Sequence, residues 1–184
     1  MKIAVDVDGV LADAIVVWLD IYNADHHNSL EKKDVKGWDF FGTLNIDRME
    51  FDRIFELAWK NWRAIPLCEA MLDQKVKELS KVGDISIVTA RSTTSIPNVK
   101  AWLRDKKIFY NEMVVVDYGP LKSTLDYDIF IDDSPLNAKD IAKSGKLVLL
   151  YDQPWNQDLE GEGIIRVRGF REAIDAITRL KNSI

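Results

Sequence analysis

The sequence predicts an α/β protein built on a parallel sheet of at least five strands. After residue 66, short apolar runs alternate with amphipathic stretches, which is typical of βα units. The first apolar run, residues 2–7, precedes them and leads into two acids, Asp6 and Asp8. Polar residues also follow several later runs, and the carboxyl edge of a parallel sheet brings such positions together. The pattern therefore indicates one sheet with a polar edge.

Composition narrows the class of protein. The 184 residues fit one domain with an insertion, or two small domains. A formal charge of -5 argues against binding polymeric nucleic acid, which requires many phosphates to be neutralised. Cys68 is the single cysteine, so an intrachain disulfide and a multi-cysteine metal site are excluded. The chain shows no signal-like start and no apolar run of membrane-spanning length, so we expect a cytoplasmic protein that does not bind membranes.

The first third of the chain predicts one strand followed by an insertion. Residues 2–7 form an apolar run suited to a strand in the middle of a sheet. Residues 14–65 contain no clear strand run and predict helices at 14–24 and 47–62. Pro66 is a plausible point of return to the core.

The next elements follow a helix, strand, helix order. Residues 69–82 carry apolar side chains at helical intervals, and Gly83 supplies a stop. Residues 84–89 then read as a strand. Pro97 suits the first turn of a helix over 97–106.

Three further apolar runs extend the sheet. They are residues 113–117, 128–132 and 146–151. Residues 135–144 predict a helix that Gly145 could end, and residues 164–167 predict a short edge strand. Apolar residues at helical spacing over 170–180 predict a C-terminal helix that packs on the core.

The polar groups at the predicted strand ends form an ordered set. They are Asp6, Asp8, Thr89, Lys122, Asp132 and Asp133. Individually each has an ordinary structural explanation, because Asp-x-Asp-Gly is often a turn, Thr89 could cap a helix and Lys122 could be solvated. Their joint occurrence on matching elements favours a reaction centre.

This set resembles the four motifs of the haloacid dehalogenase-like (HAD) phosphohydrolases. The motifs read Asp6-Val7-Asp8-Gly9-Val10, Val88-Thr89-Ala90-Arg91, Lys122 and Ile131-Asp132-Asp133-Ser134-Pro135. The resemblance implies a three-layer, Rossmann-like α/β core formed by residues 1–13 and 66–184. It also implies that residues 14–65 are a small, mainly helical cap of the C1 type, inserted after strand 1.

The same resemblance implies roles for these residues. Asp6 would be the nucleophile that forms an aspartyl-phosphate, and Asp8 would be the general acid and base. Mg²⁺ would be held by the Asp6 carboxylate, the Asp8 carbonyl and the Asp133 carboxylate, with Asp132 in support. Thr89, Ala90, Arg91 and Lys122 would bind the phosphate. Arg91 could instead pair with a core acid, and the sequence does not decide between the two.

Substrate choice is expected to depend on the aromatic 14–65 segment. Its aromatic residues include Trp18, Trp38, Phe40, Phe41, Phe51, Phe55, Trp59 and Trp62. Several of them fit the apolar face of a helix, so we favour packing for most. Trp38, Phe40 and Phe41 lie in an irregular stretch and are the better candidates for binding a base by stacking.

Local features also resemble the 5'(3')-deoxyribonucleotidase family. They are Asp-Val-Asp-Gly-Val-Leu-Ala-Asp at 6–13, Trp-Asp-Phe-Phe at 38–41, the ten-residue step from Lys122 to Asp132, and Tyr-Asp-Gln-Pro-Trp-Asn at 151–156. The resemblance implies a magnesium-dependent 5'-nucleotidase for (deoxy)ribonucleoside monophosphates, with a place in deoxyribonucleotide catabolism.

Other functions stay open at this stage. The same chemistry could serve a sugar phosphate or another small metabolite, including phosphomutase activity. A non-catalytic phosphate-binding module with this fold is an alternative of another class, although Asp8 and Lys122 argue against it. A receiver domain also phosphorylates an Asp, but it places that Asp after the third strand. The sequence does not decide between a monomer and a homodimer.

Overall fold

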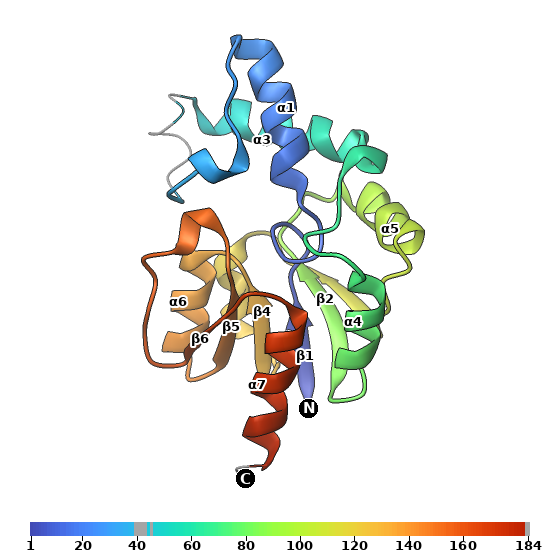
Figure 1. The fold of residues 1–184 in the computed structure, drawn as a ribbon, viewed down its shortest axis with the longest axis vertical. Coiled ribbons are helices and arrows are strands. Elements are labelled where there is room, and N and C mark those ends of the chain that lie inside the picture. The colour runs from blue at the N-terminus through green and yellow to red at the C-terminus, as the bar shows by residue number, and fades with distance from the viewer. Residues whose placement is uncertain (39–43, 45, 183–184) are drawn as a thin grey trace.

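A computed structural model describes residues 1–38, 44 and 46–182 and contains a six-stranded parallel sheet (Figure 1). The strands are β1 (Lys2–Val5), β2 (Asp84–Thr89), β3 (Glu112–Val115), β4 (Ile129–Asp132), β5 (Leu147–Tyr151) and β6 (Ile164–Val167). Their order across the sheet is β3-β2-β1-β4-β5-β6. The order reverses between β1 and β4, and a crevice at the carboxyl ends of the strands is expected at such a point.

Helices cover both faces of the sheet and give three layers (Figure 1). They are α4 (Leu72–Leu79), α5 (Ile96–Asp105), α6 (Pro135–Lys143) and α7 (Phe170–Asn182). Apolar side chains of α4, α5 and α7 join one hydrophobic cluster with Ile3 and Ile131, while α6 joins a second cluster with Phe130. Because successive strand residues point to opposite faces, β4 contributes to both clusters.

The sequence-based expectation of at least five parallel strands is confirmed, and the edge strand at 164–167 is present. Several elements are shorter than predicted, β1 and α4 among them. β1 ends at Val5, because the chain turns directly afterwards and Val7 O accepts hydrogen bonds from the next turn. α4 begins at Leu72 rather than at residue 69, because the side chain of Glu69 is held by Tyr151 and by the amide of Phe170.

The 14–65 segment contributes helices but no strand among its described residues. They are α1 (Ala14–His26) and α3 (Arg48–Lys60), with short 3₁₀ turns η1 (Lys32–Asp34) and η2 (Trp62–Ala64). These elements lie beyond the carboxyl ends of the strands (Figure 1). The two ends of the segment lie side by side, since Asp13 N donates to Pro66 O over 2.9 Å. The segment therefore leaves and rejoins the core at one place.

Two further 3₁₀ turns lie at the same edge of the sheet. They are η3 (Gly119–Thr124), which carries Lys122, and η4 (Pro154–Asn156), which follows β5. Among the described helices, none is long and apolar enough to cross a membrane.

Candidate active site

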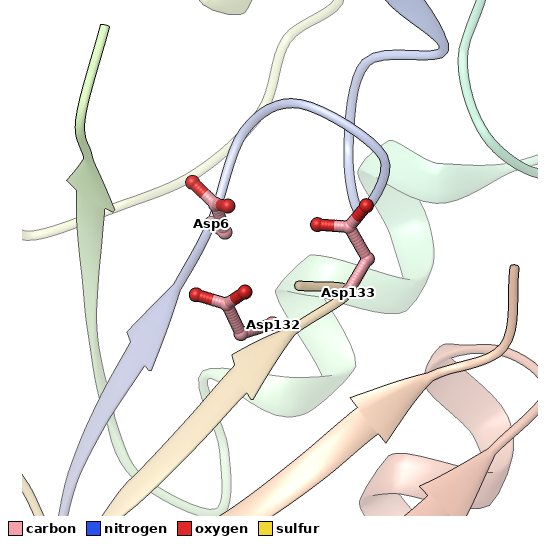
Figure 2. A group of neighbouring side chains, drawn as sticks. All are labelled: Asp6, Asp132 and Asp133. Carbon is pink, nitrogen blue, oxygen red and sulfur yellow. The ribbon is translucent and has the colours of Figure 1, made fainter. Parts of the chain in front are cut away.

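Three carboxylates meet where the strand order reverses. Asp6 follows β1, Asp132 ends β4 and Asp133 comes next. A ligand oxygen of each lies within 4.8 Å of the others, and Figure 2 shows the three carboxylates around one shared space. The two strands are hydrogen-bonded neighbours, so the sheet itself sets this distance. The acids that the sequence places more than a hundred residues apart are brought together.

One buried cation faces these acids. Lys122 is 2% exposed, and its Nζ lies 2.7 Å from Asp132 Oδ2 and 2.9 Å from Asp6 Oδ2. Burial alone would lower the pKa of Lys122, but the two carboxylates outweigh burial and raise its pKa above the ordinary value. The lysine is therefore a permanent positive charge. It is ion-paired with Asp6, the predicted nucleophile. The sequence alone would also have allowed Lys122 to be solvated, and in the structure it is buried.

Charge in the cluster is not balanced by the lysine. Burial raises the pKa of Asp6 to about 7, Lys122 opposes this, and the charges of Asp132 and Asp8 add to it. Burial also raises the pKa of Asp133, with the neighbouring Asp132 and Asp6 as further causes. Three carboxylates against one ammonium leave two negative charges when all are ionised. Hard oxygen donors with this charge fit a divalent cation such as Mg²⁺.

The two neighbouring acids have different surroundings. Asp132 uses both oxygens, since Lys122 donates to Oδ2 and the amide of Ser134 donates to Oδ1 over 2.9 Å. The side-chain amide of Asn137 also lies 3.2 Å from each oxygen. Asp133 accepts a hydrogen bond on Oδ2 from Trp155 Nε1 over 2.9 Å. The more heavily bonded Asp132 suits a supporting part, and Asp133 suits direct contact with a cation.

The glycine after the Asp-x-Asp pair is required by space and by backbone conformation. Gly9 has a φ of 75°, and a Cβ at this position would overlap the carboxylate of Asp133. The turn is also held by the loop after β5, because Gln153 Nε2 donates to Gly9 O over 2.6 Å. The first motif and the closing acidic pair are thus packed directly against each other.

The loop after β5 supplies partners that the sequence analysis did not assign. Besides Trp155 and Gln153, Asn156 donates from Nδ2 to Asp133 O over 2.8 Å. Arg166 on β6 holds Asn156 in turn through a 2.9 Å bond to its Oδ1. The Gln-Pro-Trp-Asn sequence directly follows a predicted strand, at the same sheet edge as the acids. From this position its contact with the site could have been predicted.

Asp8 is held through both of its carboxylate oxygens. Trp59 Nε1 donates to Oδ1 over 3.0 Å, and Arg91 Nε lies 2.9 Å from Oδ2. Trp59 belongs to α3 and is fully buried, with its ring at 6.3 Å from that of Trp102. The expectation that Trp59 only packs is therefore incomplete, because its indole N–H also reaches the site. The helical spacing of apolar residues cannot reveal a hydrogen bond between two residues that are 51 positions apart in the sequence.

A cavity of about 670 Å³ lies between the sheet edge and the 14–65 segment. Its lining includes Asp6, Asp8, Thr89, Ala90, Arg91, Lys122 and Asp133 from the predicted site. Thr89 ends β2 and its Oγ1 accepts from the amide of Arg91 over 3.2 Å. The volume lies within the range of small-molecule sites.

Aromatic residues of the 14–65 segment also line this cavity. Trp38 is among them and is 36% exposed. Phe40 and Phe41, the other two predicted base-binding residues, lie outside the described residues. Phe51 and Phe55 on α3, which the sequence assigned to packing, both pack on Trp18 and line the cavity. These two side chains therefore both pack in the segment and contribute to the cavity wall.

Comparison with known proteins decides the family. The family model described as "5' nucleotidase, deoxy (Pyrimidine), cytosolic type C protein" matches residues 1–183. The chain belongs to this family. It is thus a HAD-type phosphoric monoester hydrolase of the 5'-nucleotidase kind.

Individual relatives and structures agree with this membership. A nucleotidase of Clostridium acetobutylicum is 27% identical over 183 residues, covering 98% of this chain and 95% of the relative. A 5'(3')-deoxyribonucleotidase of Bacillus subtilis is 28% identical, covering 92% and 94%.

Solved structures share the fold of this nucleotidase-family chain. A haloacid dehalogenase-like hydrolase of Streptococcus pneumoniae has a TM-score of 0.70 at 15% identity, covering 95% of this chain and 97% of that one. A HAD hydrolase of Bacillus subtilis, solved bound to magnesium, has a TM-score of 0.60 at 16% identity, covering 96% and 97%. The HAD-like, Rossmann-like fold expected from the motifs is confirmed.

Proposed function

We propose that this protein is a magnesium-dependent 5'-nucleotidase that hydrolyses (deoxy)ribonucleoside monophosphates through an aspartyl-phosphate on Asp6. The observation that carries the proposal is the pairing of Asp6 with buried Lys122 at 2.9 Å, with Asp8 lining the same cavity. A nucleophilic carboxylate beside a fixed cation, with a second acid nearby, is suited to phosphoryl transfer in two steps.

The steps follow from the residues that line the cavity. Asp6 attacks phosphorus, the ester P–O bond breaks, and Asp8 gives its proton to the departing nucleoside oxygen. Water then attacks the aspartyl-phosphate, Asp8 takes a proton from that water, and inorganic phosphate leaves with Asp6 restored. Lys122 neutralises charge shared by Asp6 and the phosphate, while Thr89 and the Ala90 amide bind phosphate oxygens.

The acidic cluster supports a magnesium site. The Asp6 carboxylate, the Asp8 backbone carbonyl and the Asp133 carboxylate would hold the ion, with Asp132 orienting its neighbours. A bound divalent cation supplies neutralisation of the charge between nucleophile and phosphate. The family's HAD chemistry and the magnesium-bound structural neighbour favour this metal.

We also propose that residues 14–65 act as a C1-type cap over a core of residues 1–13 and 66–184. The position of α1 and α3 beyond the strand ends supports this division. Trp38 at the cavity wall would stack on the base, a contact of about 1–3 kcal/mol in nucleic-acid systems. The relatives' names and the cytosolic-type family description favour a nucleoside monophosphate and a cytoplasmic location.

Phosphate release from a panel of nucleotides, sugar phosphates and p-nitrophenyl phosphate tests the proposal. Each reaction is run with Mg²⁺ and with a chelator. We expect the highest kcat/KM on a 5'-nucleotide. We also expect the chelator to abolish this activity. Asp6→Asn should lower kcat by more than about 10⁴-fold, because an amide cannot form the phosphoenzyme.

Asp126→Asn is the matched control, since Asp126 is an exposed acid paired with Lys2 outside the cavity. It should keep full activity. Preference for a sugar phosphate would replace the nucleotide assignment with a small-metabolite phosphatase. Full activity of Asp6→Asn would exclude Asp6 as the nucleophile.

A further inference from the structure

The side chain of Asp8 is fixed from two separate parts of the chain. Trp59 on α3 donates to one carboxylate oxygen at 3.0 Å, and Arg91, two residues after β2, binds the other at 2.9 Å. Each donor therefore binds a different oxygen of the Asp8 carboxylate. A carboxylate bonded on both oxygens has little freedom to rotate.

Arg91 is itself held in a definite orientation. Its guanidinium carbon lies 4.4 Å from the centroid of the Phe55 ring, and its backbone N–H donates to Thr89 Oγ1. The side chains of Arg91 and Asp8 are 22% and 21% exposed, so the pair is largely shielded from water. A planar guanidinium stacked on a ring presents its Nε–H edge in one direction, and here that edge meets Asp8.

We propose that Arg91 is a positioning residue that aims the Asp8 carboxylate at the leaving-group oxygen, rather than a ligand of the transferred phosphate. The inference rests on the proposed function, in which Asp8 protonates that oxygen. The Nε–H group of Arg91 is committed to Asp8. Lys122, which is ion-paired with Asp6, and Ala90 line the same cavity and are available for the phosphate.

The chemistry of the leaving group distinguishes the two possible roles of Arg91, which are to position Asp8 or to bind the phosphate. A nucleoside oxygen leaves as a strongly basic alkoxide unless it is protonated, so its departure depends on a well-aimed acid. p-Nitrophenolate is stabilised by its ring and leaves without a proton. Loss of a phosphate ligand would slow both substrates equally, whereas loss of aim at Asp8 would slow the nucleotide selectively.

The experiment compares kcat/KM of wild type and Arg91→Ala on the best nucleoside 5'-monophosphate and on p-nitrophenyl phosphate. This constant covers the steps up to leaving-group departure and excludes hydrolysis of the phosphoenzyme. We expect a loss of about 100-fold on the nucleotide and of less than about tenfold on p-nitrophenyl phosphate. Low concentrations of guanidinium should restore part of the nucleotide activity, and inhibition by inorganic phosphate should change by less than about twofold.

Asp8→Asn supplies the reference. It should show the same selectivity, and the double variant with Arg91→Ala should be no slower than Asp8→Asn alone, because the two residues act as one unit. Arg63→Ala is the matched control, since exposed Arg63 lies over the Trp62 ring at 4.3 Å and is not among the residues that line the cavity. Its rates should match wild type on both substrates.

Equal losses on both substrates, with weaker inhibition by inorganic phosphate, would overturn the inference and assign Arg91 to the phosphate. If Arg91→Ala fails to fold, Arg91→Met keeps the aliphatic contact with Phe55 and is read by the same ratio. An inactive wild type would refute the proposed function itself, whereas an active wild type without selective loss in the Arg91 variants would refute only the inference.

Discussion

At the scale of single residues, adjacent acids in this site have different environments. Asp132 is bonded to Lys122, to the Ser134 amide and to Asn137, whereas Asp133 is bonded to Trp155. The sequence predicts that both acids reach the site, because they end an apolar run. It does not predict which donors meet each oxygen, because those donors come from η3, α6 and η4.

The raised pKa of Asp6 gives a prediction for stability against pH. Its ordinary value is 3.8 and burial raises it to about 7. The stability that this carboxyl contributes without metal is complete below about pH 3.8 and is lost as the pH rises through about 7. A cation binds the ionised form, so Mg²⁺ should raise Tm more at pH 8 than at pH 5.

Thermal unfolding at the two pH values, with and without Mg²⁺, measures this effect. Asp133→Asn should reduce the gain at pH 8, while the exposed Asp126→Asn should leave it unchanged. A gain that is equal at both pH values would show that ionisation of the cluster is not linked to metal binding.

At the scale of elements, a carboxylate on α3 adds to the contacts that attach this helix to the core. Glu56 accepts hydrogen bonds from Ser92 Oγ and from Thr94 Oγ1, the latter over 2.9 Å. Burial alone would raise the pKa of Glu56, but these hydrogen bonds and the charge of Arg91 outweigh burial and lower its pKa. The attachment is therefore present above the ordinary carboxyl range and is lost as the pH falls through the lowered pKa.

Replacing Glu56 should loosen α3 from the loop after β2. Glu56→Gln removes the charge that strengthens both hydrogen bonds, which is worth about 1 kcal/mol at a partly exposed site. Amide exchange in α3 and in residues 92–95 should become about five- to tenfold faster, as measured by hydrogen-deuterium exchange with mass spectrometry.

Glu50→Gln is the control for this change. Glu50 lies on the same helix but pairs with His26 of α1 at 2.9 Å. Its loss should leave exchange in residues 92–95 unchanged. Unchanged exchange in Glu56→Gln would mean that packing of Phe55 and Trp59, rather than this carboxylate, holds α3 in place.

The elements themselves were largely predictable, and their contacts were not. Alternating apolar runs predicted all six strands, and Pro97, Gly145 and the 170–180 period marked helix ends to within about two residues. The hydrogen bond of Trp59 with Asp8 was not predictable, because a tryptophan on an apolar helix face gives the same pattern with or without a polar partner.

At the scale of the molecule, the two faces of the sheet form separate hydrophobic clusters. Phe130 on β4 is 1% exposed and lies in the cluster that α6 covers. Phe130→Ala should lower the free energy of unfolding by about 3–5 kcal/mol, because it leaves a cavity in a packed layer. Urea unfolding monitored by circular dichroism measures this loss through the midpoint.

The exposed Phe109 provides the comparison. It is 45% exposed, and Phe109→Ala should change the free energy of unfolding by less than about 0.5 kcal/mol. Similar losses for the two variants would mean that the smaller cluster contributes little to global stability.

The central position of β1 has a consequence for biosynthesis. This strand is translated first, yet its two neighbours in the sheet begin at residues 84 and 129. At about 5–20 residues per second, the ribosome needs on the order of ten seconds to produce the partner on the β4 side. During that interval the nascent chain carries an apolar strand with an open edge, followed by an acid that has neither Lys122 nor Asp133 beside it. The newly made enzyme therefore depends on late C-terminal segments both to shield its first strand from aggregation and to gain its chemistry.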